Sequence, residues 1–147
     1  MIIMICSSGF FGKEAHRVKE ELEKMGHEIL IYSNKIQVDG KILTPKEFHK
    51  MRRESFEGAY LDTKRKLMKA HIKFVEGSDA ILVLNYDKDG KIGYVGGNTF
   101  MEICITYYLK KKIFMWKMPS EDQIHYEEIV AMEPEILNEN LEIFGKL

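Results

Sequence analysis

The chain has 147 residues, which is the length of one domain. Hydrophobic residues make up 45% of it and charged residues 31%, a composition typical of globular proteins that excludes disordered and fibrous classes. A formal net charge of −1 argues against a binder of nucleic-acid polymers. The longest apolar runs, Met1–Cys6 and Ala80–Leu84, are far shorter than the ~18 residues of a membrane span. We therefore expect one cytoplasmic domain over residues 1–147, with no membrane partner.

Two cysteines and five histidines give no sign of a metal centre. Cys6 and Cys104 form no C-x-x-C motif, and no two histidines have the spacing of a zinc-binding pair. We expect two buried, reduced thiols, and neither a metal nor a cofactor.

The first 33 residues have the pattern of a β-α-β unit. The apolar run Met1–Cys6 predicts a strand, and the turn Ser7–Gly9 leads into a helix expected over Phe11–Met25. Gly26 is well placed to end that helix, and Glu28–Ser33 predicts the next strand. Two strands joined by a helix in this way lie parallel in one sheet.

A loop is expected over Asn34–Leu43, and a long helical region follows it. Thr44 is the predicted N-cap, and Glu47 completes a capping box three residues later. The helical region extends to about Glu76, with a break expected near Gly58.

This helical region is basic, with nine Lys or Arg and four Asp or Glu over Lys46–Lys73. A solvated helix face explains such a charge, and so does a rim that attracts an anionic substrate.

The rest of the chain predicts three more strands and two more helices. In chain order these are a buried strand Ala80–Leu84, a glycine-rich loop Asn85–Gly97, a helix Asn98–Lys111, a strand Ile113–Trp116, a short helix Tyr126–Met132 and a short strand Glu135–Leu137. Alternating strands and helices predict an α/β fold, in which one doubly wound, parallel, five-stranded sheet carries helices on both faces. We expect a flavodoxin- or Rossmann-like single domain with strand order 2-1-3-4-5.

In such folds, ligands bind at the carboxyl ends of the strands, where the strand order reverses. The loops that meet there are Ser7–Phe10 and Asn85–Gly97. The hydroxyls and free amides of the first loop are suited to hold a phosphate or carboxylate, although two serines before a helix also serve as caps. Neither a P-loop nor a G-x-G-x-x-G motif is present.

The second loop ends in a glycine pair and leads to an acidic residue among apolar neighbours. Gly96 and Gly97 permit close approach of a ligand, and Asn98 or Thr99 is expected to cap the helix. Glu102 is then expected in the first helical turn. It either stabilises the helix N-terminus or presents a carboxylate as nucleophile or base.

At these residues the chain resembles a known family. The segment Gly96–Ile103, coming after Ser78–Asn85, is similar to the corresponding motif of the nucleoside 2-deoxyribosyltransferase superfamily, which includes the 2′-deoxynucleoside 5′-phosphate N-hydrolases. Ile5–Phe10 also resembles the first phosphate or sugar loop of these proteins. The order of elements matches over most of the chain, with the weakest match after Pro119.

The resemblance implies cleavage of an N-glycosidic bond with retention of configuration. Glu102 would attack the anomeric carbon of a nucleoside or nucleotide and form a glycosyl ester. Water resolves this ester in the hydrolases, and a second base does so in the transferases. The resemblance also implies a homodimer or larger homo-oligomer.

Two positions depart from the family pattern. The family's assisting aspartate lies eight residues before the aspartate that opens the third strand, and here that position is His71, counted from Asp79. Histidine can donate a proton near neutral pH, but it can also be a packed helix residue. The hydrolase serine that contacts the 5′-phosphate corresponds to Gly96, and Asn98 and Thr99 are candidates to replace its hydrogen bonds.

The candidate site therefore combines catalytic and substrate-binding residues, with Phe10 and Tyr94 able to stack on a base. The catalytic candidates are Glu102 and His71, and the substrate-binding candidates are Ser7, Ser8, Gly9, Phe10, Asn85, Tyr94, Gly96, Gly97, Asn98 and Thr99. Three functions remain open besides a hydrolase: a deoxyribosyltransferase that exchanges bases, a nucleotide sensor without catalysis, and, by fold analogy alone, a flavin-binding protein.

Overall fold

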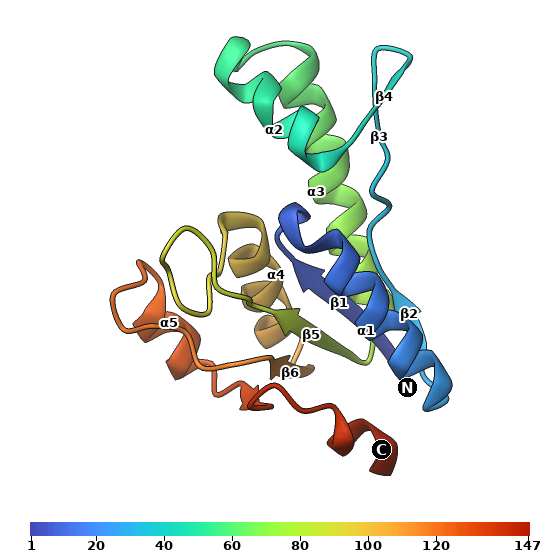
Figure 1. Cartoon of the computed structure of the whole chain (residues 1–147), viewed down its shortest axis with the longest axis vertical. Coiled ribbons are helices and arrows are strands. Elements are labelled where there is room, and N and C mark those ends of the chain that lie inside the picture. The colour runs from blue at the N-terminus through green and yellow to red at the C-terminus, as the bar shows by residue number, and fades with distance from the viewer.

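A five-stranded parallel sheet forms the centre of the structure, a computed structural model that describes all 147 residues (Figure 1). The elements in chain order are β1 (Ile2–Ser7), the 3₁₀ turn η1 (Gly9–Phe11), α1 (Gly12–Lys24), β2 (Glu28–Leu30), β3 (Ile36–Val38), β4 (Lys41–Leu43), α2 (Pro45–Glu54), α3 (Ala59–Gly77), β5 (Ala80–Leu84), α4 (Gly97–Tyr108), β6 (Lys112–Met115), α5 (Tyr126–Ala131), β7 (Glu135–Ile136) and the 3₁₀ segment η2 (Glu142–Lys146). The predicted α/β class and the five-stranded parallel sheet are confirmed.

The sheet order is β2-β1-β5-β6-β7, which differs from the predicted 2-1-3-4-5. The numbering changes because the expected loop Asn34–Leu43 contains two strands, β3 and β4, which pair antiparallel outside the main sheet. Asp39 and Gly40 join them with φ values of 46° and 76°, as a two-residue hairpin turn requires. The order reverses at β1, whose pairing with β5 ends at Ser7 and Leu84.

Each face of the main sheet carries its own apolar core. One core contains α1 and the C-terminal η2 and is centred on Leu22, Leu82 and Phe114. The other contains residues of α3, α4 and α5 and is centred on Ile81 and Ile103. Because the strands are buried on both faces, their sequences are continuous apolar runs rather than alternating ones.

A third, smaller unit projects beyond the carboxyl end of β1 and consists of the hairpin β3-β4, α2 and the first part of α3 (Figure 1). We call this unit the cap. Its core contains four buried residues, Ile36, Val38, Phe48 and Tyr60. The capping box of Thr44 and Glu47 is confirmed at the start of α2.

Several details differ from the sequence expectation: the strand expected over Glu28–Ser33 ends at Leu30, and the helix expected over Asn98–Lys111 ends at Tyr108. α4 begins at Gly97, with Gly96 as an N-cap that makes no side-chain hydrogen bond, so neither Asn98 nor Thr99 caps the helix. Glu102 consequently lies in the second turn of α4 and not in the first. Cys6 is buried as expected, but Cys104 is only partly buried. None of the helices combines the length and the apolar character needed to cross a membrane.

Candidate functional site

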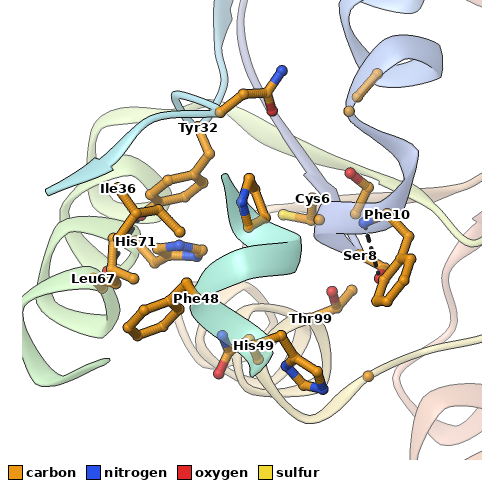
Figure 2. A pocket seen from close by; sticks show the side chains of 18 of the residues that line it. Cys6, Ser8, Phe10, Tyr32, Ile36, Phe48, His49, Leu67, His71 and Thr99 are labelled. Atoms are coloured by element: carbon orange, nitrogen blue, oxygen red, sulfur yellow. Dashed lines mark hydrogen bonds between the residues drawn. The ribbon is translucent and has the colours of Figure 1, made fainter. Parts of the chain in front are cut away.

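A cavity of about 380 Å³ lies between the carboxyl end of the sheet and the cap. One side of it is formed by the two loops at the point where the strand order reverses, Ser7–Phe10 and Asn85–Gly97, which we call the switch-point loops. The other side is formed by α2, α3 and the start of the hairpin (Figure 2). All but one of the candidate residues from the sequence line this cavity: Ser7, Ser8, Gly9, Phe10, His71, Tyr94, Gly96, Gly97, Asn98, Thr99 and Glu102. The structure thus brings together segments that lie up to 95 positions apart in the chain, from Ser7 to Glu102.

Asn85 is the exception and does not line the cavity. Its side chain is 1% exposed and ties loops together, because Nδ2 donates to the carbonyl oxygens of Gly93 (3.3 Å) and Lys117 (2.8 Å). Its Oδ1 accepts from the backbone N–H of Lys117 at 3.1 Å. Asn85 therefore ties the loop after β5 to the segment after β6, and its expected contact with substrate stays a prediction.

Glu102 and His71 meet at the wall of the cavity. Glu102 projects from α4 and is 2% exposed, and His71 projects from α3 and lies half-buried. Nδ1 of His71 donates to Oε1 of Glu102. A buried carboxylate needs such a partner, because an unpaired charge in an apolar environment is costly.

Tyr32, the second residue after β2, packs against the imidazole and holds it in place. Its ring stacks on the ring of His71 with an interplanar angle of 25°, and Figure 2 shows the two side by side. The Tyr32 hydroxyl donates to the carbonyl oxygen of Leu67, one turn earlier on α3, at 3.3 Å. Sequence reasoning missed Tyr32, although its place after a parallel strand at the switch point was a usable signal.

Cys6 lies at the end of β1 on the other side of Glu102. Burial raises the pKa of its thiol well above 9.0, and the nearby Glu102 carboxylate raises the pKa further. The thiol therefore stays protonated at neutral pH and can donate to the carboxylate. Its apolar surroundings were expected, but the contact with Glu102 was not.

The first loop places a hydroxyl and a cation together. Ser8 is the N-cap of η1, and its Oγ accepts from the backbone N–H of Phe10 at 3.5 Å. The same Oγ accepts from Nζ of Lys88 at 3.3 Å. Lys88 belongs to the loop after β5, so the two switch-point loops touch at this point.

The cavity is rich in positive charge. Arg52 on α2 and Lys64 on α3 line it together with Lys88, and His49 on α2 lies beside them. Burial lowers the pKa of Lys64, Arg52 lowers it further, and Glu102 acts in the opposite direction. Burial, followed by the charge of Lys88, also lowers the pKa of His49.

The basic helical region supplies part of this positive charge. Part of it faces solvent, but Arg52, Lys64 and His49 face the cavity, which agrees with a rim for an anionic substrate. No three His, Cys, Asp or Glu side chains lie close enough together to hold a metal ion.

No protein-family model matches the chain, and no curated protein matches it. Among solved structures, it is similar to the CMP N-glycosidase BcmB of Clostridium botulinum, with 14% identity, 99% of this chain and 97% of that chain covered, and a TM-score of 0.48. At this level of similarity, function has to be argued from the site itself.

Proposed function

We propose that the protein cleaves the N-glycosidic bond of a nucleoside or nucleoside 5′-monophosphate through a covalent glycosyl-Glu102 intermediate, with water as the acceptor. The observation that supports this most directly is the buried Glu102 carboxylate, held by His71 at the wall of a cavity large enough for a small ligand. The resemblance of Gly96–Ile103 to the deoxyribosyltransferase superfamily points to the same chemistry.

In the first step, an oxygen of Glu102 bonds to the anomeric carbon while the bond from that carbon to the base nitrogen breaks. The electron pair of the broken bond goes to the base, and the His71 imidazolium supplies the proton that neutralises it. In the second step, neutral His71 takes a proton from water as the water oxygen attacks the anomeric carbon. The ester bond breaks, and Glu102 is a carboxylate again.

The contact between the two side chains supports this division of roles. As the ester forms, Glu102 loses the negative charge that His71 faces. The imidazolium then has no carboxylate partner, at the same moment that the departing base needs a proton. Stacking on Tyr32 keeps the ring at the cavity wall during both steps.

The test is chromatographic detection of free base from deoxynucleosides, ribonucleosides and their 5′-monophosphates, each with and without a second acceptor base. We expect base release without an acceptor, and its loss in Glu102→Gln. Glu128→Gln, an exposed glutamate on α5 outside the cavity, is the matched control. Exchange only with an acceptor would identify a transferase instead. Size-exclusion chromatography of the same preparation tests the homo-oligomer that the resemblance implies.

One observation favours a second candidate, a nucleotide sensor that binds without turnover. Glu102 is already engaged by His71, which reduces its freedom to attack. A sensor would show thermal stabilisation by nucleotides with no base released. Release of base from any substrate in the panel would remove this candidate.

A further inference from the structure

Lys88 is held at the mouth of the cavity by a rigid turn. Its backbone pairs with that of Lys91 in both directions, at 3.0 and 2.9 Å, around Asp89 and Gly90. These two residues have φ values of 51° and 76°, the left-handed pair of a tight hairpin turn. Asp87 anchors the turn, because its Oδ1 accepts from the backbone N–H of Gly93 at 2.8 Å. The position of Lys88 is therefore set by the backbone.

The side chain of Lys88 reaches from this turn to the first loop. Its Nζ lies 3.9 Å from the ring centroid of Phe10 and 4.8 Å from that of Tyr94, and it donates to Oγ of Ser8. All four residues line the cavity. The ammonium thus lies at the start of η1, beside the N-cap Ser8.

This cation has no carboxylate partner. Lys88 forms none of the ion pairs in the structure, and burial lowers its pKa. The charge of Asp89 on the same turn acts on this pKa in the opposite direction, but Asp89 forms no ion pair with Lys88. Aromatic faces and a hydroxyl orient the Lys88 ammonium without neutralising it, which leaves its charge available to an anion in the cavity.

We propose that Lys88 is a specificity-determining residue, which contacts the phosphate of a nucleoside 5′-monophosphate together with Ser8 and so selects nucleotides over nucleosides. This inference rests on the proposed function for the identity of the ligand. It does not require turnover, because the contact acts in binding. A lysine that only ties the two loops together would affect nucleotide and nucleoside equally.

The experiment measures dissociation constants by calorimetry in the Glu102→Gln background, which consumes no ligand. The ligands are the ribo- and deoxyribonucleoside 5′-monophosphates of the common bases and the matching nucleosides. Lys88→Met keeps the aliphatic stem and removes the charge, and Lys88→Arg keeps the charge. Lys91→Met is the matched control, since it removes a lysine from the other arm of the same turn that does not line the cavity.

We expect Lys88→Met to weaken monophosphate binding by at least about tenfold, the size of one charged hydrogen bond, and to leave nucleoside binding within about twofold. Lys88→Arg should restore most of the preference, and Lys91→Met should not change it. An equal loss for both ligand classes, no loss, or no binding of any monophosphate would overturn the inference. Nucleotide binding that depends on Lys88 in a wild-type protein that releases no base would uphold it while contradicting the proposed hydrolysis.

Discussion

Glu102 and His71 come from neighbouring helices, and their contact joins two steps of the proposed chemistry. A carboxylate alone can attack the anomeric carbon, but a base leaves poorly without a proton. In glycosidases of this kind, two carboxyl groups divide the work. In the proposed reaction an imidazole would replace the second carboxyl group, and in the structure it contacts the Glu102 carboxylate.

Replacing His71 by Asn should separate proton donation from positioning. Asn keeps a donor near the place of Nδ1 but cannot pass a proton to the base. We expect base release to fall by roughly 10²–10⁴-fold, whereas a nitrophenyl glycoside of the same sugar, whose leaving group needs no proton, should lose less than about tenfold. Single-turnover kinetics on both substrates measure this. His16→Asn, on α1 outside the cavity, is the control. Equal losses on both substrates would mean that His71 only positions Glu102.

The thiol of Cys6 should make stability depend on pH. Burial raises its pKa above the ordinary value of 9.0, so above that pH the unfolded chain loses a proton that the folded chain keeps. Ionisation then favours unfolding, and stability falls as pH rises, by up to about 1.4 kcal/mol per pH unit. Urea unfolding between pH 7 and 10.5 should show a flatter profile in Cys6→Ala than in the wild type. Parallel profiles would contradict this assignment.

At the scale of elements, α3 carries His71, and the side chain of Lys111 caps the C-terminal end of α3. Nζ of Lys111 donates to the carbonyl oxygens of Val75 (2.9 Å), Glu76 (2.6 Å) and Ser78 (2.6 Å). The last carbonyls of a helix have no partner within the helix, and a cation stabilises the negative end of its dipole. Lys111 comes from the turn after α4, so this contact also fixes α4, which carries Glu102, against α3.

Lys111→Met should therefore lower the free energy of unfolding by about 1–2 kcal/mol. The neighbouring Lys110→Met removes the same charge, but the Lys110 side chain makes none of the hydrogen bonds in the structure, so its effect should stay within about 0.5 kcal/mol. Urea denaturation at neutral pH compares the two variants. Similar losses in both would show that the contact with α3 contributes little.

Helices and strands with a long apolar run or a regular repeat of apolar residues could be predicted from the sequence, and very short strands could not. The apolar strand Ala80–Leu84 has the predicted bounds, and the capping box at Thr44 gives the start of α2. The hairpin was missed because three-residue strands are too short to show a period. Its signal was the Asp39-Gly40 pair between Val38 and Lys41, which is typical of a two-residue hairpin turn.

At the scale of the whole molecule, the candidate site depends on an arrangement that sequence patterns do not describe. The glycine-rich loop, together with the rule that ligands bind where the strand order reverses, predicts the cavity-lining residues of the two loops. The family resemblance predicts Glu102 and His71, and their catalytic roles stay predictions. Arg52 and Lys64 reach the cavity only because the cap folds over the carboxyl end of the sheet. Periodicity reports which face of a helix is apolar, but it does not report what a charged face will meet.

The cap should be the least protected part of the chain in the free protein. Its core has four buried residues, against thirteen and ten in the clusters on the two faces of the sheet. Segments with few buried apolar contacts open at lower free energy than the global unfolding. In hydrogen exchange followed by mass spectrometry, we expect amides of β3, β4 and α2 to exchange faster than those of β1 and β5.

A ligand bound between the cap and the sheet should slow amide exchange only in the segments that line the cavity. Nucleoside 5′-monophosphate added to Glu102→Gln should slow exchange in α2 and in the Ser7–Phe10 loop, because both line the cavity. α5 contributes no residue to the cavity and should exchange at an unchanged rate. A cap as protected as the sheet without ligand would show that its small core is held mainly by contacts with the rest of the molecule, such as the close approach of Gly9 to Pro45. Slowing spread evenly over all elements would instead indicate general stabilisation and not a ligand bound between cap and sheet.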